Sequence, residues 1–449
     1  METEKTKLVS IMKIINFLFF LMVAIPIQAQ QNITRKLLVE EAIVHSNLLQ
    51  IQDQRAALSL QDRMKARFTY FPNIDLNASY THLNDNIMFS VPPIQIPVNQ
   101  DVMIEKQLDP IILQGKNIFR TSIDAKMVLF TGLRAPHLAS AAYHKYRADL
   151  LLKDKHLADL IIEVLGYYDR LALIDQSLEV LKESKLRLDK QAEFSKKALQ
   201  AGLISSYDLN KIKIARQEIR KKEIEIEGKK GLVILKLQQL TGLDQETFKN
   251  TQVKLDQWSV IDGKSSVENR PEIKALEEAI LASDYKRRAE NSAYLPQVMA
   301  FGKRELYEED LSALDPAWYL GVGLKWSLFD GLQRGREIQK AKIERNIREI
   351  EKREAVQQLT LNLENRRQEL SVANQLIEVN KEQVQETLDA LNITLKEYEL
   401  GLADINDRLA AENDHQTALL DYLQAIYDQR MASLHLMAAT GDLSLKNIN

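Results

Sequence analysis

The chain has 449 residues, with 15 Gly, 10 Pro and a formal net charge of -3 from 60 basic and 63 acidic side chains. This near balance gives no indication of a nucleic-acid partner, and the lack of cysteine excludes disulfides, thiolate catalysis and cysteine-bound zinc. Proline is missing from residues 137–270 and 317–449. Because proline interrupts helices, these two stretches predict unusually long ones.

The N-terminal residues have the three parts of a secretory signal. Lysines precede an apolar core over residues 14–25, and the small residue Ala29 follows it. The core is too short for a comfortable membrane span, which needs about 20 apolar residues. We therefore expect a signal peptide over residues 1–29, with translation starting at Met1 or at Met12. The alternative is an uncleaved membrane anchor.

Four segments are predicted to be β-strands. Apolar and polar side chains alternate over residues 73–81, 119–130 and 318–329, which is the period of a strand. A fourth segment, 297–307, alternates poorly and is assigned mainly from an internal repeat. One apolar and one polar face over about ten residues is typical of an outer-membrane barrel strand between lipid and water. The alternative is a soluble antiparallel sheet with one face on a core.

Two long helical hairpins are predicted over residues 137–241 and 334–441. Residues 137–200 as one helix would span roughly 96 Å at 1.5 Å per residue. Apolar side chains recur every seven residues, with a second line three residues on, which is the a/d pattern of a coiled coil. The first grid contains Leu157, Val164, Leu171, Leu178, Ala192 and Leu199.

The two halves of the chain repeat each other at an offset of 199 residues. Three glycines recur in matching context, and the heptad grid keeps the same register, which indicates a tandem duplication. The returning helix of the second half carries an alanine line that would let helices approach closely, although helix propensity alone also explains alanine. The glycine pairs are Gly132 and Gly331, Gly202 and Gly401, and Gly242 and Gly441; the alanines are Ala411, Ala418, Ala425, Ala432 and Ala439.

The first copy carries an insertion between its two strands. The motif at 70–72 precedes its counterpart at 294–296 by 224 residues rather than 199, so the first copy is longer by 25 residues. The added residues fall within 82–118, which hold Pro92, Pro93, Pro97 and Pro110. Because proline cannot donate to a strand ladder, we expect an extracellular loop or cap.

Four strands per chain leave two open edges, which do not persist in hydrocarbon. Barrels close at about eight strands or more, so the chain must pool strands with copies of itself. Two copies would give eight strands and an interior filled by side chains, whereas three copies give twelve strands around a lumen. A conduit therefore favours a homotrimer.

The order and spacing of these motifs resemble the TolC-type outer-membrane efflux proteins over essentially the whole mature chain. The resemblance implies a mainly α-helical fold with a membrane β-barrel, built from two tandem repeats of two strands and a long helical hairpin. The first repeat would cover 30–242, an equatorial connector 243–269 and the second repeat 270–449. Three chains would form a 12-stranded β-barrel continued by an α-helical tunnel. The motifs are Tyr-Phe-Pro at 70–72, Tyr-Leu-Pro at 294–296, Leu-Phe-x-Gly at 129–132 and 328–331, Leu-Thr-Gly at 240–242, and the turns at 202–208 and 401–407.

The resemblance implies an exit duct in the bacterial outer membrane, with a periplasmic helical extension. Its partners would be outer-membrane lipid, a periplasmic adaptor (membrane fusion protein) and an inner-membrane pump driven by protons or by ATP. The adaptor would dock on the two helical tips, at Gly202 and Leu203 and at Gly401 and Leu402. The sequence names neither the cargo nor the class of pump.

A periplasmic gate is also implied by the resemblance. Asp407 stands six residues after the second tip glycine, where the family has a gate aspartate; Tyr398 and Asp208 match two further gate positions. Ala403 and Ala410 stand where the family's best-known member has an arginine and another aspartate. The alternative role for both aspartates is helix capping, because each closes a capping-box pattern.

Two other classes of function compete with the duct. A non-conducting periplasmic coiled-coil adaptor or structural protein would share the signal peptide and the hairpins, but not two pairs of lipid-facing strands. An enzyme would need a catalytic motif, and the sequence has no nucleophile elbow, phosphate-binding loop or H-E-x-x-H. His137, His144 and His156 are spaced unlike metal ligands. We expect no enzyme activity, cofactor or metal.

Overall fold

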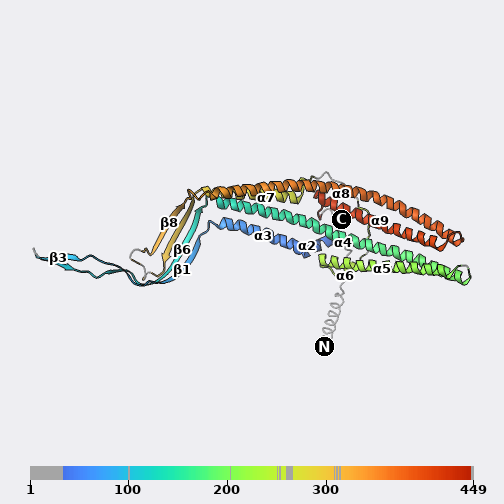
Figure 1. The fold of residues 1–449 in the computed structure, drawn as a ribbon, viewed down its shortest axis with the longest axis horizontal. Coiled ribbons are helices and arrows are strands. Elements are labelled where there is room, and N and C mark those ends of the chain that lie inside the picture. The colour runs from blue at the N-terminus through green and yellow to red at the C-terminus, as the bar shows by residue number, and fades with distance from the viewer. Residues whose placement is uncertain are drawn as a thin grey trace, which may run out of the picture.

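The computed structural model describes residues 34–445, apart from 100–101, 203, 250, 252–253, 259–265, 308, 310–311 and 313–314. The expected signal peptide over 1–29 lies outside this part of the chain. The molecule is elongated, with a sheet towards one end and the turns of two helical hairpins at the other (Figure 1). None of the helices in the described ranges is both long and apolar enough to span a bilayer.

Two long helical hairpins dominate the chain. Their outgoing helices have 67 residues each and their returning helices 36 each, and corresponding bounds differ by 199, the offset of the sequence repeat. Shorter helices precede each pair of main strands and flank the middle of the molecule. The outgoing helices are α4 (Arg134–Gln200) and α8 (Gln333–Glu399), the returning ones α5 (Ser206–Thr241) and α9 (Ile405–Thr440), and the shorter ones α2 (Arg35–His45), α3 (Asn47–Phe68), α6 (Gln245–Lys249) and α7 (Pro271–Asn291).

Four strands form one antiparallel sheet in the order β1-β6-β7-β8, so β1 and β8 are its edges. The last strand is shorter than the predicted 318–329, because the chain leaves the ladder after Lys325 and the Trp326 indole donates instead to the Tyr294 carbonyl, at 3.1 Å. The strands are β1 (Asn73–His82), β6 (Asn117–Phe130), β7 (Gln297–Glu305) and β8 (Trp318–Lys325).

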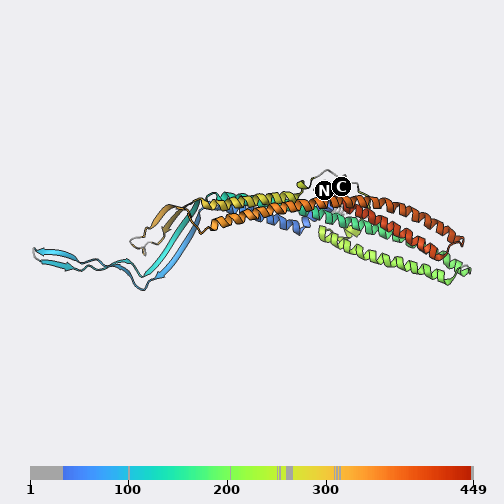
Figure 2. The ribbon, with the colours of Figure 1, turned by 45° about the horizontal axis from the view of Figure 1, so that its top comes forward.

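The segment between β1 and β6 forms an interrupted β-ribbon rather than the expected loop. It contains two short ladders, β2 (Ile87–Phe89) with β5 (Ile111–Gln114), and β3 (Ile94–Asn99) with β4 (Val102–Lys106). The ribbon extends beyond the sheet, away from the helices (Figure 2). Pro97 is paired within β3, beside a register shift. The other three prolines lie in the breaks, so proline interrupts the pairing without abolishing it.

The helices continue the sheet in the same order. Each main strand is joined directly to a helix, and α4 packs against α3 and α7 while α7 packs against α8. The strand-to-helix turn at Gly132 and Leu133 has positive φ at both residues. A Cβ at Gly132 would lie 2.8 Å from the Ser292 carbonyl oxygen, so glycine is required there.

The main core lies midway along the molecule, where α2, α4, α5 and α9 meet. Heptad residues of α4 form its axis, with Val164 and Leu171 fully buried. Four members of the alanine line of α9 are also buried: Ala418, Ala425, Ala432 and Ala439. Small side chains at these positions allow α9 to pack closely between α4 and α8.

Candidate functional site

The sheet has one apolar and one polar face. Directly paired residues project to the same face, so the register places Leu76 with Ile123 and Ala300 with Val322 on the apolar side. This face is open, since Leu320 and Val322 are 78% and 70% exposed. Together with the unpaired edges of β1 and β8, it forms an apolar band that the chain does not cover by itself.

Aromatic side chains lie at both ends of the apolar face. Tyr80, Phe119 and Trp318 lie towards the end away from the helices, while Tyr294 and Trp326 lie at the helix end. The two tryptophans are eight residues apart, or about 26 Å at 3.3 Å per residue. That separation agrees with the apolar band of an outer-membrane barrel, about 25 Å tall between aromatic girdles.

Several polar and charged groups on the other face have partners within the sheet. Asn77 donates to the Asp124 carboxylate at 2.6 Å, and the Ser122 hydroxyl donates to it at 3.0 Å. Lys303 and Glu305 form an ion pair at 2.8 Å. Because the interior of an outer-membrane barrel is polar, this face suits the lining of an aqueous lumen.

The two helical tips have nearly identical backbones. Gly202 and Gly401 both have φ of 74°, the left-handed conformation that ends many helices. A Cβ at either position would meet no atom within 4 Å, so these glycines serve the turn rather than packing. Leu402 is strongly exposed, as a docking residue must be, whereas its counterpart Leu203 lies outside the described residues.

Asp208 and Asp407 both take part in capping boxes. The Asp208 carboxylate accepts from the Ser205 backbone at 3.0 Å, and the Asp407 carboxylate accepts from the Asp404 backbone at 3.1 Å. The N-cap side chains accept in return from the Asp208 and Asp407 backbones, at 3.3 and 3.0 Å. The capping role is therefore present at both tips; Asp407 is exposed and Asp208 is half-buried.

A family model matches the second half of the chain, and solved structures match most of it. Residues 264–442 match the family model described as outer membrane efflux protein. No curated protein matches the sequence. Among solved structures, the chain is similar to the CmeC outer membrane channel of Campylobacter jejuni, with a TM-score of 0.72 at 14% identity over 91% of this chain and 86% of that one. The chain has the fold of TolC-type outer-membrane efflux proteins.

Two further channels agree with this assignment. VceC of Vibrio cholerae has a TM-score of 0.71 at 15% identity, over 90% of this chain and 95% of its own. The MtrE outer membrane channel of Neisseria gonorrhoeae, in its open state, has a TM-score of 0.67 at 15% identity, over 91% and 88%. The resemblance drawn from the motifs is confirmed, as is the location expected of this family, the outer membrane with a periplasmic helical extension.

The TolC-type gate positions are not joined within this chain. The Tyr398 hydroxyl is buried and has no hydrogen-bond partner among the described residues. It reaches neither Asp208 nor Asp407, whose carboxylates bind the N-caps of their own helices. Among the described residues, the Tyr398 hydroxyl is therefore left without a partner near the second tip.

A buried polar cluster below the second tip was missed by the sequence reasoning. Glu412 accepts from the Ser184 hydroxyl and from Arg187, with Nε and Nη2 at 3.0 and 2.9 Å. Arg408 is also buried, and its Nε and Nη1 have no partner in the part of the chain described here. Burial lowers the pKa of Arg408, while Glu412 and Tyr398 oppose that shift. Ser184, a polar residue beside the heptad position Leu181, was the one sequence signal.

A second buried cluster fastens the connector to α9. Arg430 donates to both carboxylate oxygens of Asp169, at 2.8 and 2.9 Å, and to the Asp256 carbonyl at 2.8 Å. Gln429 exchanges two hydrogen bonds with the Trp258 backbone, at 3.1 and 2.6 Å. These contacts hold residues 256–258 against the helices at the middle of the molecule.

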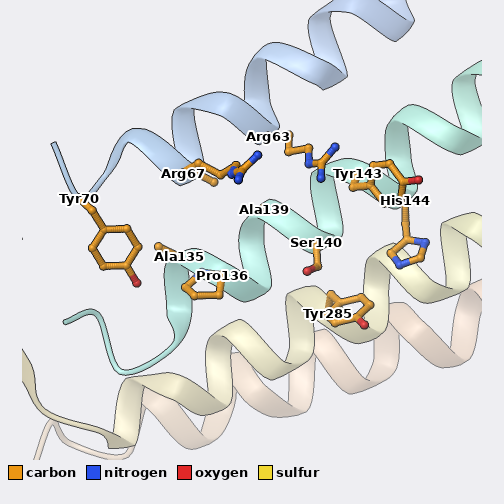
Figure 3. A pocket seen from close by; sticks show the side chains of 11 residues that line it. Arg63, Arg67, Tyr70, Ala135, Pro136, Ala139, Ser140, Tyr143, His144 and Tyr285 are labelled. Atoms are coloured by element: carbon orange, nitrogen blue, oxygen red, sulfur yellow. The ribbon is translucent and has the colours of Figure 1, made fainter. Parts of the chain in front are cut away.

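A pocket of about 540 Å³ lies where the helices meet the sheet (Figure 3). The Arg63 guanidinium lies over the Tyr143 ring at 4.4 Å, and His144 stacks on Tyr285 at 5.2 Å. His144 is also hydrogen-bonded to Glu278 at 2.6 Å. The aromatic and cationic groups thus join α3, α4 and α7 directly below the strands.

Proposed function

We propose that the chain forms a homotrimeric duct through the outer membrane. The observation that carries the proposal is a four-stranded sheet with an open apolar face and two unpaired edges. The apolar face suits lipid, but the open edges do not persist in hydrocarbon unless they pair. Pairing β8 of each copy with β1 of the next would close twelve strands, enough for an aqueous lumen lined by the polar face.

The helices would extend the barrel as a tunnel. They follow the strand order, so three copies of α3, α4, α7 and α8 would surround the same axis. Apolar side chains remain exposed along the outermost helices, with Ile224 and Leu232 on α5 and Leu361 and Val379 on α8. Contact between α5 of one copy and α8 of the next would bury both sets.

Cargo would pass through this duct without chemistry in the chain. The exposed tips at Gly202 and Gly401 would receive a periplasmic adaptor, which links the duct to an inner-membrane pump driven by protons or ATP. The ribbon of β2 to β5 would then lie outside the cell. This orientation follows from placing the long helices in the periplasm.

We assign the periplasmic gate to Asp407, with Asp208 and Tyr398 beside it. Three Asp407 carboxylates facing one axis repel one another, and a bound cation relieves that repulsion. The capping role does not compete with this assignment, because a carboxylate that accepts one backbone N–H bond keeps further lone pairs for a cation. Ala403 and Ala410 remove two further partners, so we expect this gate to leak.

The duct is tested by mass and conductance. Purified protein in detergent should have three times the mass of the mature chain, and the trimer should conduct ions across a planar bilayer. A water-soluble monomer without conductance would instead support the coiled-coil adaptor.

A pair of variants tests which face of the sheet meets lipid. Val322→Lys places a charge on the apolar face near mid-membrane, at a cost of about 2 to 4 kcal/mol. It should reduce the trimer recovered from outer membranes. Tyr319→Lys on the polar face of the same strand should not. Equal recovery of both variants would contradict the assignment of the faces.

A further inference from the structure

Arg304 is a charged residue on the apolar face of the sheet, and no described residue pairs with it. The register pairs it with Ile123 on β6 and with Trp318 on β8, which both belong to that face. Among the described strands of this sheet, no other arginine or lysine and no carboxylate projects to the same side. The Arg304 side chain is exposed, and no described residue forms an ion pair or hydrogen bond with it.

Two cations on the opposite face have partners within the chain. Arg120 is paired with Asp315, and Lys303 is paired with Glu305 at 2.8 Å. Lys303 and Glu305 are the immediate neighbours of Arg304 in β7, so the compensating carboxylate is available but projects to the other side. The partner of Arg304 is therefore not found among the described residues.

The depth of Arg304 in the proposed barrel restricts that partner. It lies seven residues from Gln297, the helix end of β7, or about 23 Å along the strand. The apolar band of such a barrel is about 25 Å tall. Arg304 thus lies at the outer boundary of the band, beside Trp318, where a lipid-facing arginine costs little and its head reaches polar groups.

The neighbouring β1 strand of a second copy supplies no partner. β7 is an interior strand, so β8 separates it from the neighbouring β1 in the proposed closure. That β1 is two strand spacings away, about 9.6 Å. Its residues on this face include Ile74, Leu76 and Tyr80, and it carries no carboxylate there.

We propose that Arg304 binds a phosphate group on the headgroup of an outer-leaflet glycolipid. The guanidinium is a planar fork of donors that pairs with phosphate through two parallel hydrogen bonds. The outer leaflet of a bacterial outer membrane consists largely of phosphorylated glycolipid, so phosphate is present at this depth around the whole barrel. Each protomer of the trimer would hold one such lipid, with Trp318 at the same level of the interface.

The binding is tested by native mass spectrometry of the intact trimer titrated with bisphosphorylated lipid A. Because charge-assisted hydrogen bonds are lost, Arg304→Gln should weaken lipid binding about tenfold. Arg304→Lys keeps the charge but loses the planar guanidinium. Its affinity for lipid A should lie between those of the wild type and Arg304→Gln. Dephosphorylated lipid A should bind the wild type and Arg304→Gln equally weakly.

Arg120→Gln is the matched control, because it removes one arginine from the polar face of the same sheet. It should leave lipid binding at the wild-type level. Equal binding of lipid A by Arg304→Gln and the wild type would overturn the proposal, and so would equal losses in Arg304→Gln and Arg120→Gln.

The inference rests on the proposed trimeric barrel, and the same experiment separates the two. If the wild-type chain is not a trimer by mass, the duct itself is wrong and this lipid site falls with it. If trimer mass and conductance are intact while Arg304→Gln binds lipid A normally, only the lipid site is wrong.

Discussion

Helices α5 and α9 are counterparts that differ in their surroundings. Both have 36 residues, begin with a capping box and end at a glycine with positive φ. Yet Leu434 of α9 is fully buried while its counterpart Leu235 of α5 is 50% exposed, and Leu423 is 8% exposed against 61% for Ile224. The reason is position: α9 lies between α4 and α8, whereas α5 lies at the outside of the layer.

The comparison shows what a tandem repeat keeps and what it changes. Length, caps and turns are equal in the two copies, because they are fixed by local sequence. The side chains differ because the neighbouring helices differ. Arg430 of α9 forms a buried ion pair, whereas the equivalent residue of α5 is the exposed Gly231. The apolar side chains left open on α5 then indicate a surface that a second copy covers.

The largest expected effect on the unfolding free energy concerns the buried ion pair between Arg430 of α9 and Asp169 of α4. Arg430→Met leaves Asp169 buried without its bidentate partner, which costs roughly 3 to 5 kcal/mol. Arg35, whose Nη2 is 3.6 Å from Asp169, should offset part of this loss. Thermal unfolding followed by the helical circular dichroism signal should show a much lower midpoint.

Two further variants control this prediction. Adding Asp169→Leu to Arg430→Met removes the stranded charge and should recover most of the stability. Gly231→Ala, at the matching place on α5, should be neutral or slightly stabilising. An unchanged midpoint for Arg430→Met alone would show that the pair is not important for stability.

The next effect compares two leucines that the repeat makes equivalent. Leu434→Ala should cost about 2 to 5 kcal/mol of unfolding free energy, because it opens a cavity in a closed core. Leu235→Ala should cost under about 1 kcal/mol in the isolated protomer, since half of its side chain is already in water. In the proposed trimer, Leu235→Ala should instead lower the detergent concentration at which subunits dissociate. Equal unfolding losses would refute the difference between the two helices.

Much of the architecture could be predicted because its signals are local. Proline spacing indicated the long helices, and the glycines at 202 and 401 mark the turns at which φ is positive. Alternation indicated strands at 73–81 and 119–130, where β1 and β6 occur. The sequence does not predict the ribbon, because four prolines argue against a continuous ladder; the chain accommodates them with breaks and a register shift.

The buried polar clusters could not be predicted for a physical reason. A heptad pattern shows which side of a helix packs against its partner. It does not show whether a charged residue beside that seam faces water or is covered by a third helix. Arg408 and Glu412 follow the tip in a stretch that reads as a solvated face, and both are buried. Their burial depends on α4, about 220 residues earlier in the chain.

Acidic pH should weaken α9 more than α5. Burial lowers the pKa of His415, helped by Arg187 and opposed by Glu412 and Glu183; burial also lowers the pKa of His435. As pH falls, the two histidines of the unfolded chain therefore bind protons before those of the folded chain. The stability that the neutral imidazoles provide is present above about pH 6.5 and is lost as pH falls below it.

The corresponding measurement is the thermal midpoint between pH 7.5 and 5. Replacing both histidines with Gln should flatten its decline, whereas Arg216→Gln with Lys236→Gln, at the equivalent positions of α5, should leave the slope unchanged. Burial raises the pKa of Asp428 and acts in the opposite direction, so the difference between variants is the test. An equal slope in the histidine variant would remove both histidines from the pH response.

The smallest effect on stability should come from the tips, where it separates capping from gating. Asp407 is the N3 residue of the capping box, and an Asn side-chain oxygen there can still accept from the Asp404 backbone N–H, so Asp407→Asn should change the unfolding free energy by under about 1 kcal/mol. It removes one carboxylate per protomer from the proposed ring, however, and should weaken block by multivalent cations severalfold in bilayer recordings.

Asp404→Asn is the matched control, because it removes the same charge three residues away. Backbone N–H groups of Asp407 and Asn406 lower the pKa of the Asp404 carboxyl, which ties its charge to the helix N-terminus rather than to the tunnel axis. If Asp407→Asn weakens cation block and Asp404→Asn does not, Asp407 lies at the constriction. Both variants remove the same charge, so a difference between them reflects the position of the carboxylate. Equal losses of cation block in the two variants would show that only the total charge of the tip matters. If block is unchanged while the thermal midpoint falls, Asp407 is a cap and the gate lies elsewhere.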